Sequence, residues 1–135
     1  MRTRPALTLA DVKTILAAAE AEATKNKWNV VIAVLDDGGH LLGLHRMDGA
    51  TPANAEIAVL KGKSAAVSRR PTRNWEERIA AGRTAVLKMP VLPITGGLPI
   101  MAGAECVGGV GVSGVQSHED EQIAQAGIDA LALAK

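Results

Sequence analysis

The chain has 135 residues, of which 47% are hydrophobic and 21% are charged, and its formal net charge is +1 at pH 7. These proportions predict one soluble globular domain over residues 1–135. A charge so close to zero gives no field that would attract nucleic acid or an anionic membrane. The two tryptophans, with no tyrosine or phenylalanine, offer few rings for stacking on bases.

Residues 1–13 contain no hydrophobic run of the kind found in signal peptides, and no run of about 18 apolar residues follows. We therefore expect a cytoplasmic protein with no nucleic-acid or membrane partner.

The first part of the sequence predicts a helix followed by a β-hairpin. Thr8, with an aspartate three residues later, is typical of a helix N-terminus, and apolar residues then recur at helical spacing to about Lys25. Residues 28–35 predict a strand that is apolar, and therefore covered, on both faces. The sequence Asp-Asp-Gly-Gly at 36–39 predicts a tight turn, and residues 40–47 predict the returning strand.

Two helices are predicted next. Thr51 before Pro52 favours a helix start, and small residues keep this helix, which runs to about residue 68, thin enough to pack closely on a sheet. Pro71 ends it, and residues 74–82 predict a shorter helix.

The last part of the sequence predicts a second pair of strands and a final helix. Prolines in 86–95 favour extended backbone without strand pairing. Strands are predicted at 98–101 and 105–113, and residues 117–120 resemble a capping box at the start of the last helix. Because the strands come in hairpins, we expect an α+β fold with an antiparallel sheet and helices packed against it.

The strand at 105–113 is rich in glycine. Strict alternation divides its residues between two faces, with Val107, Gly109, Gly111 and Ser113 on one and Cys106, Gly108, Val110 and Val112 on the other. Interior glycines weaken a strand and usually mark the close approach of a backbone or a ligand. We expect a helix of the same chain, a second subunit or a small molecule to cover the nearly bare glycine face. The lone cysteine is interpreted as a small buried hydrophobe.

Histidines are the first candidates for metal or acid–base chemistry. His40 and His45 lie five residues apart on one predicted strand, so they point to opposite faces and cannot share a metal ion. No spacing typical of a protein metal site occurs, and the Gly-x-Gly-x-x-Gly pattern at 109–114 lacks the following strand of a dinucleotide site. A haem needs only one axial ligand, and His40, beside the turn, is the most accessible candidate.

Charged residues around the second helix are further candidates. Glu56 and Lys61 lie five residues apart, too far round the helix for an ideal pair, and they either face solvent or an interface or belong to a site. Arg70, in the basic run after this helix, either holds a carboxylate or phosphate or is a solvated cation at a helix C-terminus.

Several of these segments together resemble the GlcG family, which includes the C-terminal domain of PduO and the haem-binding protein HbpS. The hairpin carries motifs similar to D-x-G-G-H-L and R-M-D-G-A at 36–41 and 46–50. The second helix and the following turn fit at 56–58, 61 and 70–72. The end of the chain is similar to G-G-x-P-I, V-G, G-V-S-G and E-D-E at 96–100, 107–108, 111–114 and 119–121.

This resemblance implies a profilin-like α+β fold, with a central antiparallel sheet flanked by helices, and a homo-oligomer. It also implies a small planar or anionic ligand, with haem as the leading candidate. In that hypothesis His40 is the axial ligand and Arg46 or Arg70 pairs with a propionate. The full set of candidate ligand-binding residues is His40, Arg46, Lys61, Arg70, Gly96 and Gly97.

A second hypothesis is a small catabolic enzyme, lyase-like or isomerase-like, that acts on a small carboxylated substrate at a subunit interface. Arg70 would hold the carboxylate, Glu56 or His45 would move protons, and the amides of the Gly96–Gly97 loop would stabilise negative charge. The sequence alone leaves binding and catalysis open.

Overall fold

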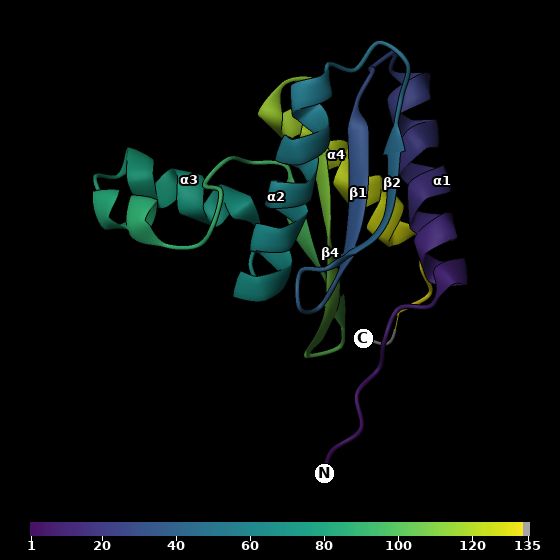
Figure 1. Ribbon diagram of the computed structural model, residues 1–135, viewed down its shortest axis with the longest axis horizontal. Helices are drawn as coiled ribbons and strands as arrows, with labels where there is room; N and C mark the ends of the chain where they lie inside the picture. Colours follow the sequence, from purple (N-terminus) through teal and green to yellow (C-terminus); the bar gives the residue numbers. More distant parts are fainter. Residues whose placement is uncertain (134–135) are drawn as a thin grey trace.

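The computed structural model describes residues 1–133 and contains a four-stranded sheet with helices on both faces (Figure 1). In chain order the elements are α1 (Leu9–Lys25), β1 (Val31–Asp36), β2 (Leu41–Arg46), α2 (Pro52–Ser68), α3 (Thr72–Ala80), the 3-10 helix η1 (Thr84–Lys88), β3 (Gly97–Ala102), β4 (Glu105–Ser113) and α4 (Ser117–Asp129). The strands lie in the order β2-β1-β4-β3, and each neighbouring pair is antiparallel. The predicted α+β fold is confirmed.

Two apolar layers hold the helices on the sheet. Helices α1 and α4 cover one face and α2 covers the other (Figure 1). The chain at β1 contributes alternately to the two layers, with Val30, Ile32 and Val34 in the first and Val31, Ala33 and Leu35 in the second. All six of these residues are fully buried, as the continuous apolar run predicted.

The glycine face of β4 lies against α2 of the same chain. A Cβ atom at Gly109 would meet the carbonyl oxygen of Gly62, and one at Gly111 would meet that of Ala58. The helix backbone therefore packs directly on the strand backbone, which only glycine allows. Of the three predicted alternatives for this face, the helix is the one that the structure shows.

The strict alternation predicted for β4 is wrong at the start of the strand. Ile100 of β3 pairs with Gly108, but the next residue, Met101, pairs with Cys106, so β4 contains an extra residue at a bulge. Val107 consequently packs in the layer of α1 and α4. The Sγ of Cys106 lies on the opposite side, 3.7 Å from a carbonyl oxygen of α2, and this cysteine is buried, as predicted.

Element boundaries also differ from the prediction. Helix α3 begins two residues early, and residues 84–88 form η1 because the prolines that favour extended backbone come only after it. The α4 helix is capped by Gln116, whose backbone N–H donates to Glu119 Oε1 at 3.1 Å, instead of by Ser117. Helix α3 and the η1 segment project sideways from the sheet (Figure 1).

Candidate functional site

The turn between β1 and β2 presents His40 to solvent. Oδ1 of Asp36 accepts hydrogen bonds from the backbone N–H groups of Gly38 and His40, each 2.9 Å long. Gly39 completes the turn with a φ of 84°, which other residues rarely adopt. His40 lies just before β2, not within it as predicted, and its side chain is 83% exposed. A ligand can therefore reach its imidazole.

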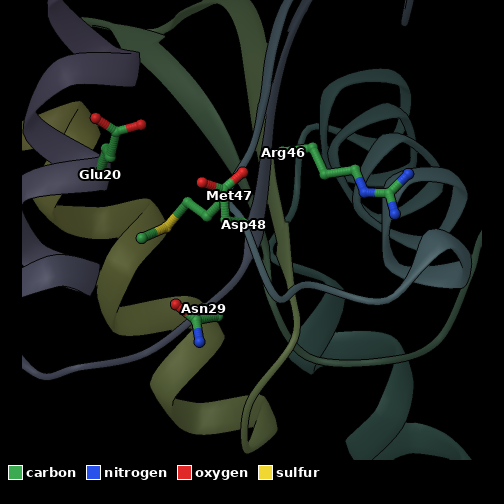
Figure 2. Close-up of a pocket in the computed structure, with 5 residues that line it drawn as sticks. All are labelled: Glu20, Asn29, Arg46, Met47 and Asp48. Carbon is green, nitrogen blue, oxygen red and sulfur yellow. The ribbon is translucent and has the colours of Figure 1, made fainter.

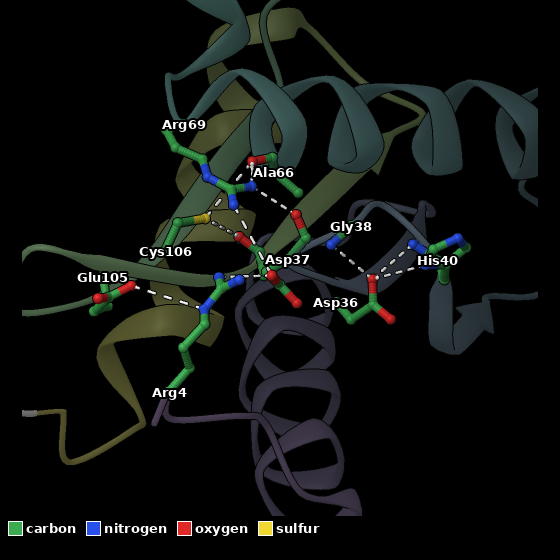
Figure 3. Close-up of polar contacts among 10 residues, drawn as sticks. Arg4, Asp36, Asp37, Gly38, His40, Ala66, Arg69, Glu105 and Cys106 are labelled. Carbon is green, nitrogen blue, oxygen red and sulfur yellow. Dashed lines mark hydrogen bonds and ion pairs between the residues drawn. The ribbon is translucent and has the colours of Figure 1, made fainter. Parts of the chain in front are cut away.

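The carboxylate of Asp36 also orients this imidazole. Nδ1 of His40 lies 3.3 Å from Oδ1 of Asp36 (Figure 3). The backbone N–H of His40 lowers the pKa of Asp36 most, and the N–H of Gly38 adds to this effect against the opposing effect of burial. Asp36 is therefore ionised at neutral pH, and its carboxylate lies beside Nδ1 of the imidazole. A carboxylate beside one ring nitrogen is common among histidines that bind a metal through the other nitrogen.

Two arginines fix the other side of the hairpin. Arg4 Nη2 donates to Asp37 Oδ2 at 2.7 Å, and Arg69 Nη1 donates to the backbone oxygen of Asp37 at 2.6 Å (Figure 3). Arg69 ends α2 in the left-handed conformation, where its guanidinium also donates to the Ala66 carbonyl at 2.6 Å. The N-terminal segment and α2 thus hold the turn in place. Sequence reasoning missed Arg4 and placed Arg69 only in the basic run after α2, because both lie more than 30 residues from their partner Asp37 in the chain.

The opposite end of β2 borders a cavity of about 350 Å³, lined by Glu20, Asn29, Arg46, Met47 and Asp48 (Figure 2). Figure 2 shows the Arg46 side chain pointing away from the other four, and its Nη2 is 3.5 Å from the Ala50 carbonyl. Arg46 and His40 are separated by six residues of the chain, roughly 20 Å if extended. The structure therefore does not bring these two predicted ligand residues together.

The three side chains of the enzyme hypothesis are also dispersed. His45 pairs with Glu20 of α1 at 3.3 Å. Glu56 is exposed near the start of α2, and Arg70 follows its end, roughly 20 Å further along the helix. There the Arg70 guanidinium lies 5.8 Å from the ring centroid of Trp75. No single substrate of small size contacts all three within one subunit.

The glycine loop before β3 is part of the interior. Gly96 and Gly97 are both buried. The N–H of Gly97 donates to Thr72 Oγ1 at 3.0 Å, and the carbonyl of Gly96 accepts from the N–H of Val112 at 3.0 Å. The Gly97 amide is therefore already bonded within the fold and is not presented to a substrate.

Lys61 lies inside the fold, where its ammonium is already bonded. Its side chain is 2% exposed, and Nζ donates to Asp120 Oδ2 and to the Val112 carbonyl, both at 3.0 Å. Burial raises the pKa of Asp120, and the ammonium of Lys61 opposes that effect. The pair links α2, β4 and α4. The sequence did carry a signal for this burial, because Lys61 falls between the small residues of α2 that pack on the sheet.

Within residues 1–133, no group of three or more His, Cys, Asp or Glu side chains is arranged to hold a metal ion. No helix of this part of the chain combines the length and the apolar character needed to cross a membrane.

Comparison with known proteins identifies the family. The family model described as "Haem degrading protein HbpS-like" matches residues 7–129. The chain belongs to the HbpS-like family. This HbpS-like chain is 45% identical to protein GlcG of Escherichia coli K12 over 114 residues, which are 84% of the chain and 85% of GlcG. It is also 30% identical over 128 residues to a 15.0 kDa protein of the dhaT-dhaS intergenic region of Citrobacter freundii, covering 91% and 90% of the two chains.

Solved structures show the same fold. A double mutant of HbpS from Streptomyces reticuli is 32% identical, with a TM-score of 0.89 over 98% of this chain and 91% of its own. A PduOC:heme complex is 25% identical, with a TM-score of 0.87 over 96% and 98% of the two chains. The predicted family and its fold are confirmed.

Proposed function

We propose that this HbpS-like protein binds haem and that Nε2 of His40 is an axial ligand of the iron. The family match and the similarity to a PduOC:heme complex support haem as the ligand. The observation that carries the choice of residue is exposure, because both His40 and His45 have a carboxylate oxygen 3.3 Å from Nδ1, but the side chain of His40 is 83% exposed and that of His45 only 44%. Nε2 of His40 is thus the ring nitrogen that a large ligand can reach more easily.

The residues next to His40 suit a haem. Leu41 and Leu42, which follow it, are 53% and 39% exposed, and a porphyrin would cover apolar surface of this kind. Haem supplies an iron with axial positions that accept an imidazole nitrogen. Asp36 would keep the imidazole in position, as carboxylates do for metal-bound histidines.

Titration of the purified protein with hemin tests this proposal. We expect a saturable, stoichiometric Soret shift at micromolar or lower concentration. His40→Ala should weaken binding at least tenfold or change the spectrum, because the axial ligand is lost. His45→Ala is the matched control, since His45 is also exposed and paired with a carboxylate. Unsaturable binding by the unsubstituted protein would contradict haem binding, and an unchanged spectrum in His40→Ala would remove His40 from the proposal.

We further propose a cytoplasmic homo-oligomer. The projecting segment after α3 supports self-association, since Leu87 is 63% exposed and Ile94 is 40% exposed. Light scattering after size exclusion should give a multiple of the 14.0 kDa chain mass, and cell fractionation checks the location. A monomer at micromolar concentration would contradict self-association.

The enzyme hypothesis stays a prediction, because it places the site at a subunit interface. Within one subunit its carboxylate-binding arginine and its proton carriers lie apart, and the Gly97 amide is already bonded. We therefore carry forward haem binding alone.

A further inference from the structure

The outer face of α2 carries an apolar stripe that the sheet does not cover. The helix packs on the sheet through Ala58, Lys61, Gly62 and Ala65, all of which are buried. A second set with the same helical spacing, Leu60, Lys63, Ser64 and Val67, lies round the helix from the first. In that set Leu60 and Val67 are 41% and 40% exposed. Leu60 and Val67 are therefore two partly exposed apolar side chains, two helical turns apart, with Lys63 and the buried Ser64 between them.

This stripe forms one wall of a cavity of about 350 Å³. The lining residues are Leu60, Lys63, Ser64, Met89, Pro90, Val91 and Leu92. The buried hydroxyl of Ser64 accepts the backbone N–H of Leu92 at 2.7 Å, which holds the second wall against the helix. Lys63 is the only charged residue among those that line the cavity. The groove is therefore apolar with one positive charge.

The same stripe lies against the hairpin that carries His40. A Cβ atom at Gly39 would lie 2.8 Å from Lys63 Cγ and 3.1 Å from Val67 Cγ1. The backbone immediately before His40 thus packs on Lys63 and Val67. Lys63 connects the groove with the hairpin, because it lines the groove and also touches the turn at Gly39.

Haem has a chemistry that complements this surface, because its ring is apolar and its edge carries two carboxylates. An exposed lysine can place its apolar stem along the ring and its ammonium at a carboxylate. Among the ion pairs of the described residues, none involves Lys63. Its charge is therefore not already neutralised by a carboxylate of the fold.

We propose that the α2 groove, lined by Leu60 and Met89 among others, together with the adjoining Val67, seats the haem ring whose iron His40 binds, and that Lys63 pairs with a propionate. This inference rests on the proposed function and adds the seat and the anion partner, which the comparisons do not assign. It replaces the predicted propionate partners Arg46, which lies at the other end of β2, and Arg70, whose guanidinium lies near the Trp75 ring.

Comparing the binding of hemin with that of its dimethyl ester distinguishes the effect of the charge of Lys63 from the effect of its packing. Lys63→Met keeps most of the apolar stem and removes the charge, so it should weaken hemin binding about fivefold, typical of one charged contact near the surface. The same variant should bind the dimethyl ester as well as the unsubstituted protein does, because the ester has no carboxylate to pair. Lys63→Arg should retain hemin affinity. Lys13→Met, at an exposed position of α1, should have no effect on either ligand.

Each other outcome decides against some part of the inference. If the unsubstituted protein binds hemin saturably and His40→Ala weakens binding but Lys63→Met does not, haem binding stands and the α2 seat is wrong. Equal losses for hemin and the ester would show that Lys63 acts by packing, which overturns the ion pair. A changed oligomeric mass with unchanged hemin affinity would make the stripe a contact between copies of the chain. Unsaturable binding by the unsubstituted protein would remove both the seat and the proposed function.

Discussion

Two acid–base pairs in this protein have similar geometry and opposite surroundings. Lys61 Nζ and Asp120 Oδ2 lie 3.0 Å apart with both side chains 2% exposed. His40 Nδ1 and Asp36 Oδ1 lie 3.3 Å apart with the side chains 83% and 35% exposed. The pairs therefore differ mainly in the amount of water around them.

Burial decides what each pair can do. The charges of Lys61 and Asp120 have left water, so each needs further hydrogen bonds, and these come from the carbonyl of Val112 and the N–H of Val115. That pair is engaged entirely within the fold. The His40 pair is screened by water and adds little stability, and its imidazole stays open to solvent. Exposure thus distinguishes the pair that holds three elements together from the pair whose imidazole a ligand could reach.

The largest effect is expected when the buried pair is broken. Lys61→Met leaves the Asp120 carboxylate buried without its cation, which should cost about 3–5 kcal/mol in the free energy of unfolding. Urea denaturation at pH 7 followed by circular dichroism measures this cost. Replacing both partners, as in Lys61→Met with Asp120→Leu, should recover most of the loss because no charge then remains buried. A double variant as unstable as the single one would mean that the pair is required for more than charge balance.

The pH dependence of stability should have opposite signs for the two carboxylates. Burial raises the pKa of Asp120 above its ordinary value of 3.8. Between pH 3.8 and the raised pKa, this carboxyl group is therefore protonated more often in the folded than in the unfolded protein. Its contribution to the free energy of unfolding falls as the pH rises through that range. The pKa of Asp36 is lowered, mainly by the N–H of His40. Its contribution is therefore present above 3.8 and is lost as the pH falls through the folded pKa.

Asparagine at each position isolates these contributions. From about pH 3 to pH 7, the unfolding free energy of the unsubstituted protein minus that of Asp36→Asn should rise, and the same difference for Asp120→Asn should fall. We expect the change for Asp36 to be less than about 1 kcal/mol, since water screens this pair. If both free-energy differences changed with pH in the same direction, exposure would not determine how the two carboxylates affect stability.

The comparison also explains how much the sequence could predict. Local patterns predicted the sequence of elements along the chain, the burial of β1 and the covering of the glycine face at Gly109 and Gly111, and these predictions agree with the structure. The same patterns left open whether a helix, a second subunit or a small molecule covers that face. The bulge in β4 does not follow, since it depends on how β3 aligns with Cys106. The partner of Lys61 lies 59 residues away in the chain, so spacing could indicate its burial but could not identify Asp120.

The candidate site likewise combines features that local patterns predict with features that depend on tertiary packing. The turn motif at 36–41 identified His40 as accessible, because turn chemistry is local. The contact of Gly39 with Lys63 and Val67 depends on how the hairpin packs on α2, and no pattern within either segment encodes it. Arg46 and Arg70 were chosen by charge and by the family motifs at 46–50 and 70–72, and neither reports where the side chain lies relative to His40.

The smallest effect on stability, and the sharpest test of the exposed pair, is expected from Asp36→Asn. An asparagine oxygen can still accept the N–H groups of Gly38 and His40, so the turn should form and the unfolding free energy should change by less than about 1 kcal/mol. The negative charge that keeps a proton on Nδ1 is lost, so the fraction of His40 protonated on Nε2 should rise, which ¹⁵N chemical shifts of the ring measure without any haem. Hemin affinity should fall about tenfold, the usual cost of removing a carboxylate behind a metal-bound histidine. Asp37→Asn is the control, since Asp37 pairs with Arg4 and not with the imidazole. Unchanged ring shifts and unchanged hemin affinity in Asp36→Asn would mean that Asp36 only shapes the turn, and the distinction between the two pairs would then rest on Lys61 and Asp120 alone.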